Sequence, residues 1–305
     1  HEEPKLFSRA EGVHYYTPEG RAVLDGCSGL FTSPIGHGRK EIAEAVYKQL
    51  LELDFVSSFQ RSHPKAFEAA ERVARLTPDG LDKIFFCNSG SEAVDTAMKI
   101  AMAYHRARGQ GSRTMFVSRE RAYHGVGFGG VALSGLVNNR RTFGPGLPNT
   151  VHMRHTHGTE RFVMGEPEQG ADLAEDLARV IALHGAENIA ACFVEPIAGS
   201  TGMLVPPKGY LKRLRELCTQ HGILLVFDEV ITGFGRTGRA FAAQSFGIKP
   251  DLMTMAKAIT NGVQPMSAVA ADNSVYKTIV EDSPNPKAAN EFFHGYTWSA
   301  HPAAC

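Results

Sequence analysis

Apolar and polar positions follow two different periods along this chain, and each period predicts a different element. Near the N-terminus, apolar residues alternate with polar ones around 13–16 and 22–24, on either side of the turn sequence at 17–20, Thr-Pro-Glu-Gly. Alternation interrupted by a short turn predicts a β-hairpin. From Arg39 the apolar positions recur every three or four residues, which predicts a helix, and a second helix is expected over 64–76.

Further along, short apolar runs alternate with helical patterns. Strands are expected at 83–87, 114–117, 189–194, 223–227 and 252–255, and helices at 91–108 and 209–221. Continuous apolar strands that alternate with helices are typical of an α/β fold with a buried, mostly parallel sheet. Such folds bind ligands beyond the carboxyl ends of their strands, so the residues after each strand are the first candidates for chemistry.

Two stretches carry no such pattern. Residues 140–170 are rich in Gly, Pro, His and Thr, and are expected to form a long excursion on the binding side or a subunit contact. Three histidines of this stretch could bind a metal, but their spacing fits no helical or zinc-finger pattern, so we expect no metal; they are His152, His155 and His157. Residues 283–289 are expected to form a surface loop.

The composition restricts the class of protein and of partner. The chain has 305 residues, 43% of them hydrophobic, and its 32 basic residues balance its 32 acidic residues. This balance excludes disorder as the main state and gives no electrostatic reason to expect nucleic acid or an anionic membrane as a partner. No apolar run reaches the ~18 residues of a membrane-spanning helix. The five cysteines are far apart and form no C-x-x-C pair, which favours reduced thiols and a cytoplasmic protein.

Polar residues suited to a ligand follow the first two strands. Residues 88–92, Asn-Ser-Gly-Ser-Glu, stand where a helix begins, and its free N–H groups, a hydroxyl and a glycine would form a phosphate cradle. An ordinary capped turn would use the same residues. Residues 123–125, Tyr-His-Gly, could stack on a flat ligand or simply pack. The glycines of 125–130 superficially suggest a dinucleotide loop, but they neither follow a strand directly nor open a clean helix, so we discount that interpretation.

Charged residues follow the later strands. Glu195 and Asp228 each come after a buried run, where a carboxylate is poorly placed unless it is paired. Asp228 could cap a turn, face a cationic partner or coordinate Mg²⁺, and the last option is weakened because the chain has no G-x-x-x-x-G-K-[ST] loop. Lys257 lies among small apolar residues. Desolvation there would lower the pKa of the amine and make it nucleophilic, unless the side chain reaches out to solvent.

Taken together, these pieces match one ligand. Pyridoxal phosphate has a phosphate for a helix N-terminus, a ring for stacking, a ring nitrogen for an aspartate and an aldehyde for a lysine. All four partners are expected at the strand ends of one sheet. The joint occurrence of four ordinary structural features by chance is far rarer than any one of them.

The chain resembles the class III (ω-) aminotransferases of the fold-type-I pyridoxal-phosphate enzymes, and within them the β-alanine–pyruvate and ω-amino-acid–pyruvate type. The matching segments, in the family's order, are GVHYYTPEGRAVLDGCSGL, FFCNSGSEAVDTAMKIA, AYHG, FVEPIAGSTGM, FDEVITGFGRTG, DLMTMAKAIT and HGYTWSAHPAA. The resemblance implies an α/β fold with a mostly parallel central sheet flanked by helices, and a small α+β domain only partly present. Residues 1–36, with the hairpin, would belong to the small domain and residues 37–305 would form the large cofactor-binding domain. The C-terminal small domain is expected to be missing from this chain.

The resemblance also implies roles for single residues. Lys257 would form an aldimine with the cofactor and then shuttle a proton between the substrate Cα and C4′ of the cofactor. Asp228 would keep the ring nitrogen protonated, and Val230 and Tyr123 would cover the two ring faces. The remaining cofactor contacts would be Ser89, Gly90, Ser91, His124, Gly125, Glu195 and Thr297, with Gly90 and Ser91 on the phosphate. The substrate contacts would be Leu30, Phe31, Phe59 and Glu229.

The expected activity follows from the same resemblance. An amino group would pass by a ping-pong mechanism from an ω-amino acid or amine, such as β-alanine, to a keto acid, with pyruvate as the expected acceptor. Thr297 would reach the cofactor phosphate of a partner subunit, which implies a homodimer or a dimer of dimers with active sites at the interface. An aminomutase or decarboxylase of the same fold, or a catalytically silent fragment that binds the cofactor, would carry the same lysine and aspartate, so these alternatives stay open.

Overall fold

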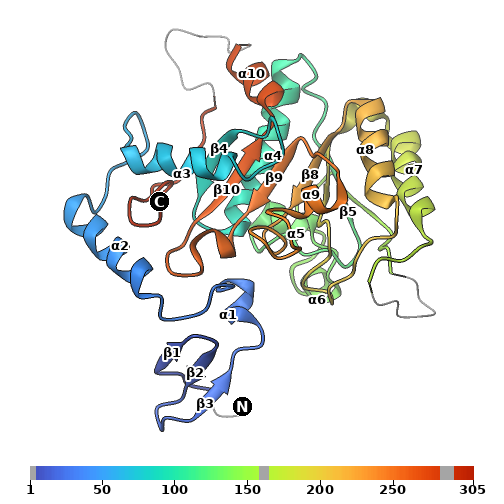
Figure 1. Cartoon of the computed structure of the whole chain (residues 1–305). Helices are drawn as coiled ribbons and strands as arrows, with labels where there is room; N and C mark the ends of the chain where they lie inside the picture. Colours follow the sequence, from blue (N-terminus) through green and yellow to red (C-terminus); the bar gives the residue numbers. More distant parts are fainter. Residues whose placement is uncertain (1–4, 158–164, 282–291) are drawn as a thin grey trace.

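A seven-stranded sheet forms the centre of the computed structural model, which describes residues 5–157, 165–281 and 292–305 (Figure 1). The strands lie in the order β4 (Lys83–Cys87), β10 (Ser267–Ala271), β9 (Leu252–Met255), β8 (Leu224–Asp228), β7 (Ile189–Val194), β5 (Met115–Arg119) and β6 (Thr150–Met153). The strands from β9 to β6 are parallel, and β10 runs antiparallel to both of its neighbours. The expected mostly parallel sheet is thus confirmed, with one reversed strand.

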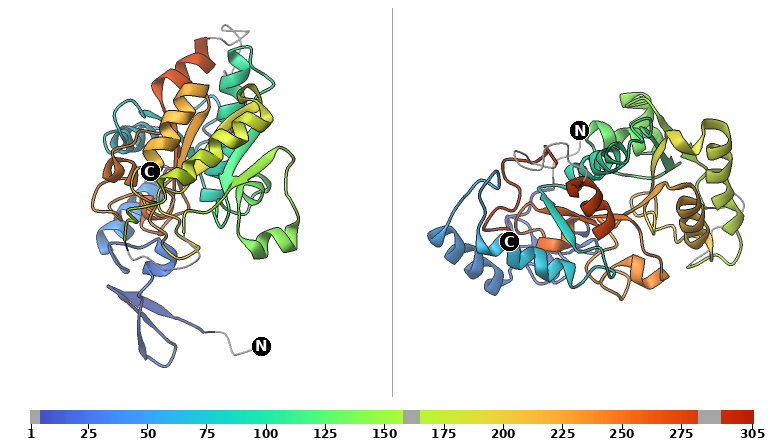
Figure 2. Two further views of the ribbon diagram at one scale, coloured as in Figure 1. Left: turned by 90° about the vertical axis from the view of Figure 1, so that its right-hand side faces the viewer. Right: turned by 90° about the horizontal axis from the view of Figure 1, so that it is seen from above.

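Helices cover both faces of this sheet (Figure 2). On one face lie α4 (Gly90–Ala107), α5 (Phe128–Leu133) and α10 (Asn273–Glu281). On the other lie α3 (Pro64–Ala74), α7 (Glu175–His184), α8 (Tyr210–His221) and α9 (Ala242–Phe246). A strand covered on both faces has no solvent side, which is why β7 is a continuous apolar run whose six residues are all buried.

A small antiparallel sheet at the N-terminus lies apart from the central one, at the bottom of Figure 1. It consists of β1 (Arg9–Glu11), β2 (His14–Tyr16) and β3 (Ala22–Leu24), and the β2–β3 pair is the expected hairpin. The remaining helical elements are α1 (Ser28–Phe31), α2 (Lys40–Glu52), α6 (Val137–Phe143), η1 (Ala171–Ala174), η2 (Ala186–Asn188) and η3 (Lys257–Thr260). The side chain of Asn261 joins the two parts, because it binds the Ile35 N–H at 3.2 Å and the Gly36 carbonyl at 2.9 Å.

Two strands of the central sheet lie outside the sequence-based prediction. β6 falls within 140–170, which we expected to be an excursion, and its polar Thr150 and His152 leave no apolar run to mark it. β10 has the sequence Ser-Ala-Val-Ala-Ala, mostly residues with little preference for strands, and it pairs with β4 and β9 on both sides. The predicted loop at 283–289 lies outside the described residues. Among the helices that the structure describes, none is both long and apolar enough to cross a membrane.

Candidate active site

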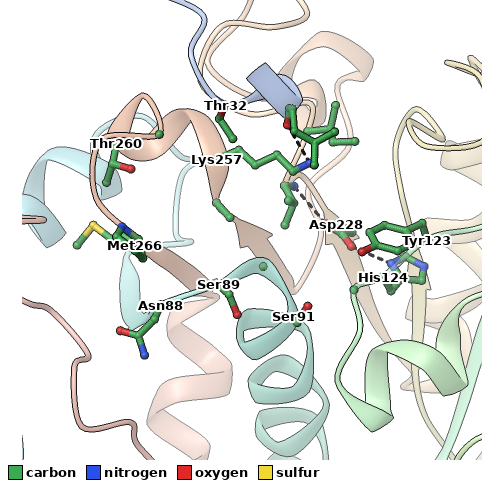
Figure 3. A pocket seen from close by; sticks show the side chains of 18 of the residues that line it. Thr32, Asn88, Ser89, Ser91, Tyr123, His124, Asp228, Lys257, Thr260 and Met266 are labelled. Atoms are coloured by element: carbon green, nitrogen blue, oxygen red, sulfur yellow. Dashed lines mark hydrogen bonds and ion pairs between the residues drawn. The ribbon is translucent and has the colours of Figure 1, made fainter. Parts of the chain in front are cut away.

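The residues that follow the parallel strands meet in one cavity of about 400 Å³ (Figure 3). Segments after β4, β5, β7, β8 and β9 contribute to its wall. Eleven of the residues predicted from the sequence line it: Leu30, Ser89, Gly90, Ser91, Tyr123, His124, Gly125, Glu195, Asp228, Val230 and Lys257. The volume lies within the range of roughly 300–1,000 Å³ that is typical of small-molecule sites.

One end of the cavity is the N-terminus of α4. Ser89 caps this helix, since its Oγ accepts a hydrogen bond from the N–H of Glu92 at 3.2 Å. The first N–H groups of a helix have no acceptor within it, and the helix dipole adds positive charge there. The Ser89 carbonyl accepts a bond from Ser267 Oγ of β10 at 2.7 Å, and Ser91 Oγ accepts one from the N–H of Val126 at 3.0 Å. This end of the cavity is therefore suited to an anion.

The glycines of residues 125–130 pack the segment after β5 against α4. Gly125 has a φ of +97°, and a Cβ atom on it would lie 2.6 Å from Ser91 Oγ. A Cβ atom on either of two further glycines of this run would lie 2.5 Å from the Asp95 carboxylate. The run is thus a close backbone contact with α4, which agrees with discounting it as a dinucleotide loop.

We expect Gly125→Ala to lower the free energy of unfolding by about 1–3 kcal/mol, because alanine is strained at this φ and its methyl group has no room. Urea denaturation measures the effect. Gly111→Ala is the matched control, since a Cβ atom there meets nothing within 4 Å. Equal losses in the two variants would contradict the steric account of Gly125.

Asp228, the last residue of β8, is held by donors from three segments. Its Oδ2 accepts a hydrogen bond from Nδ1 of His124 at 2.8 Å. Its Oδ1 accepts bonds from the N–H of Val230 and the hydroxyl of Thr254, both at 3.1 Å. Asp228 and His124 are both buried, so their interaction is stronger than it would be at the surface. A carboxylate fixed in this way can hold a cationic group of a ligand.

Glu195, which follows β7, is a second buried carboxyl group beside the cavity. Its Oε1 accepts a hydrogen bond from the N–H of Tyr123 at 3.0 Å, and its Oε2 accepts one from the N–H of Gly199 at 2.8 Å. Burial raises the pKa of Glu195, and the charge of Asp228 acts in the same direction. The bond to Tyr123 fixes the backbone of the residue whose ring lies on the cavity wall (Figure 3).

Lys257 lies two residues beyond the end of β9 and begins η3. Its φ of +53° is unusual for a residue with a side chain and costs of order 1–3 kcal/mol. The Nζ atom donates a hydrogen bond to the Leu30 carbonyl at 3.1 Å. Burial lowers the pKa of Lys257, although the nearby carboxylates of Asp228 and Glu195 oppose the shift. A larger share of the amine is therefore neutral and nucleophilic than at an exposed lysine.

Four predicted site residues do not line this cavity, and one of them, Glu229, is bound to backbone groups instead. Its Oε2 accepts the N–H of Ala242 and its Oε1 accepts the N–H of Ala243, both at 2.7 Å, so it caps the start of α9. Adjacent residues at the end of a strand point in opposite directions, which sends Asp228 into the cavity and Glu229 away from it.

The other three residues lie in different places. Phe59 was also expected at the substrate, but its ring lies in a second cavity of about 720 Å³, where it leaves no room for a side chain on Gly295. Phe31 does not line the first cavity, although the centre of its ring is 5.5 Å from the Nζ atom of Lys257. Thr297 lies outside the cavity, and its contact with a partner subunit stays a prediction.

The cavity wall also contains residues that the sequence patterns did not single out: Thr32, Ile197, Ile231, Ala256, Thr260, Gly262, Gln264, Pro265 and Met266. Four of them, Gly262, Gln264, Pro265 and Met266, belong to the turn between η3 and β10. Because β10 is reversed, this turn remains at the same edge of the sheet as the parallel strand ends. Thr254, which binds Asp228, was also missed, and its signal was a polar residue inside the otherwise apolar β9.

Of the three histidines considered as metal ligands, His152 and His155 have rings that bond to backbone groups. The Nε2 atom of His152 bonds to the Leu133 carbonyl at 3.0 Å, and the Nδ1 atom of His155 accepts the N–H of His157 at 3.2 Å. Over the described ranges, no group of three or more His, Cys, Asp or Glu side chains could hold a metal ion.

Comparison with known proteins gives consistent results. The family model described as aminotransferase class-III matches residues 1–305. The omega-aminotransferase of Caulobacter vibrioides is 55% identical over 304 residues, which cover 99% of this chain and 69% of that protein. The omega-amino acid–pyruvate aminotransferase of Pseudomonas putida is 52% identical over 305 residues, or 99% of this chain and 68% of that protein. The crystal structure of the omega transaminase from Pseudomonas jessenii in complex with PMP has a TM-score of 0.92 at 36% identity, and the match covers 99% of this chain and 66% of that chain.

The family model spans every residue of the sequence, and the relatives and the solved structure are all aminotransferases. Their shared type agrees with the chemistry inferred from the strand ends, where a lysine, an aspartate and a helix N-terminus meet. The chain belongs to the class III aminotransferases.

Proposed function

We propose that this aminotransferase moves the amino group of an ω-amino acid such as β-alanine, or of an amine, to pyruvate. The observation that carries the proposal is the convergence of Lys257 and Asp228 on one cavity that ends at the N-terminus of α4. The choice of substrates is supported by the relative from Pseudomonas putida, which is named for ω-amino acids and pyruvate.

Pyridoxal phosphate is the cofactor of class III aminotransferases, and the residues of the cavity fit it. Gly90, at the start of α4, has no side chain, and a Cβ atom there would lie 3.1 Å from the Val230 side chain. We assign the phosphate to Gly90 and Ser91, and the two ring faces to Tyr123 and Val230. When bound, the cofactor supplies an aldehyde that condenses with amines and a ring that accepts the electron pair of a deprotonated substrate.

Lys257 would anchor the cofactor through Nζ and later move a proton at the same atom. Its lowered pKa favours the neutral amine, which is the form that can attack an aldehyde or take a proton from the substrate Cα. Proton transfer by a positioned side chain contributes roughly 10²–10⁴-fold to a rate. The hydrogen bond to the Leu30 carbonyl gives the freed Nζ a fixed position at the cavity wall.

Asp228 would hold a proton on the ring nitrogen. Its two oxygen atoms are already oriented by three donors, so no reorganisation is needed when a cationic N–H approaches. Glu195 would fix the Tyr123 side of the ring through the Tyr123 backbone.

The test is a product assay with the purified chain and pyridoxal phosphate. We expect β-alanine and pyruvate to give alanine, and β-alanine alone to bleach the colour of the bound cofactor once per active site. Release of CO₂ without alanine would point instead to a decarboxylase, and an isomerised amino acid formed without pyruvate would point to an aminomutase. Absence of any reaction despite cofactor binding would point to a catalytically silent protein that only binds the cofactor.

We also propose a homodimer or dimer of dimers in which Thr297 reaches the cofactor phosphate of the partner subunit. Exposed aromatic side chains on the same segment support this, since Phe293 and Trp298 are 92% and 61% exposed. The separate N-terminal sheet supports the assignment of residues 1–36 to a smaller domain and of 37–305 to the large domain. Sedimentation velocity should give at least twice the mass of one chain, and a purely monomeric species would overturn the shared site.

A cytoplasmic location is the remaining part of the proposal. All five cysteines are free thiols, three of them buried, which suits a reducing compartment.

A further inference from the structure

His124 is held on two sides within the core. Its Nδ1 donates to Asp228 Oδ2 at 2.8 Å, and its backbone N–H donates to Ser134 Oγ at 3.1 Å. His124 and Ser134 are 1% and 0% exposed. The His124 Nε2 atom is buried and has no hydrogen-bond partner among the described residues. The ring is therefore oriented by the Asp228 bond and by the position of its own backbone.

The segment 133–135 fixes that backbone. The N–H of Arg121 donates to the Gly135 carbonyl at 3.0 Å, and the N–H of Gly135 donates to the Ala122 carbonyl at 2.9 Å. A Cβ atom on Gly135 would lie 2.4 Å from the Arg119 carbonyl, so the two segments touch through their backbones. A shift of segment 133–135 must therefore move the segment that carries His124.

His152 holds segment 133–135 from the far side. This histidine lies on the edge strand β6, and its Nε2 bonds to the Leu133 carbonyl at 3.0 Å. Because a carbonyl only accepts, Nε2 must carry the proton. Burial lowers the pKa of His152, and the neighbouring Arg140 and His124 act in the same direction, which favours the neutral ring. Leu133 is fully buried, so loss of the donor would leave a buried carbonyl without this hydrogen bond.

We propose that His152 is a positioning residue for Asp228, acting through the Leu133 carbonyl, Ser134 and His124. The proposal rests on the function proposed above for the Asp228 carboxylate. It gives a role to a histidine that is not part of the cavity wall and that the sequence suggested only as a metal ligand. Leu133 and Ser134 are joined by their peptide bond, and the other three links are hydrogen bonds between buried or half-buried groups.

The test compares His152→Leu, which removes the donor, with His152→Gln, whose side-chain N–H can reach the same carbonyl. His155→Leu is the matched control, because His155 is a half-buried histidine three residues away whose ring, among the described residues, bonds locally to the His157 N–H. Ser134→Ala breaks the next link from a different element and replaces His152→Leu if that variant does not fold.

The first measurement uses the protein without cofactor. The proton between His124 Nδ1 and Asp228 should give a far-downfield NMR signal, assigned by its loss in His124→Gln. We expect this signal to be broadened or shifted in His152→Leu and in Ser134→Ala, and to be unchanged in His152→Gln and His155→Leu. An unchanged signal in both disruptive variants would overturn the proposal.

The second measurement is the half reaction with β-alanine at saturating cofactor. We expect His152→Leu to lower kcat roughly tenfold through misplacement of Asp228, with KM within about twofold and recovery in His152→Gln. An equal loss in His155→Leu would show general weakening of the edge strand and would refute positioning. An inactive wild-type protein with the expected NMR differences would refute the proposed function while leaving the structural link intact.

Discussion

Lys257→Ala is expected to abolish turnover, with a fall of roughly 10²–10⁴-fold or more, because the variant lacks both the amine that anchors the cofactor and the proton carrier. Borohydride reduction of the wild-type protein should fix one cofactor per chain, visible by mass spectrometry of the intact protein and located on Lys257 by peptide mapping. The variant should bind pyridoxal phosphate without any reducible bond.

Lys212→Ala serves as the control for this experiment. Lys212 is exposed on α8, so its loss should change neither the fixed mass nor the rate. Cofactor that is still fixed by borohydride in Lys257→Ala would assign the covalent bond to another lysine and would contradict the role given to Lys257.

Asp228→Asn is expected to retain cofactor but to slow the first half reaction by about 10²–10³-fold, the usual cost of losing one preorganised electrostatic contact. The amide carries no charge to stabilise a protonated ring nitrogen. It also replaces one acceptor oxygen by a donor, which then faces either the His124 ring or the donors from Val230 and Thr254. Stopped-flow spectra with β-alanine give the rate, and the absorbance of the bound cofactor confirms its retention.

Asp251→Asn provides a matched control at the opposite end of the same sheet. Asp251 accepts bonds from the Leu225 N–H and from Arg215, both at 2.7 Å, where β8 begins. We expect that variant to lose some stability without any change in the half reaction. An equal first half reaction in Asp228→Asn and the wild type would refute the role at the ring nitrogen.

The sequence was sufficient to predict the elements whose surroundings are uniformly apolar. Ile189–Val194 and Leu252–Met255 were predicted with the bounds that the structure shows, because buried parallel strands leave an unbroken apolar run. The helix after β4 was also predicted within one residue of its start, since Ser89 is a strong capping residue. Cavity residues next to these elements were therefore found as well.

The missed features depend on tertiary contacts that leave a weak local pattern. β10 consists of small residues that are extended because strands lie on both sides. The helices that were not predicted are α5, α6, α7, α9 and α10. The Glu229 side chain points away from the cavity because it follows the last residue of β8, whose side chain points into it. Thr254 is a single polar residue in an apolar strand. The resemblance to a family supplied roles for residues, but it could not show that Phe59 lies in another cavity.

The reversed strand has a consequence for how the protein is made. β4 stands at the edge of the sheet, and its sheet partner among the described strands is β10, which also supplies the Ser267 bond to Ser89 over 178 residues. At about 5–20 residues per second, a ribosome needs roughly 10–40 s to advance from one of these serines to the other. The nascent chain therefore carries the anion-binding turn throughout that time without the strand that secures it, and the cofactor site can close only late in translation.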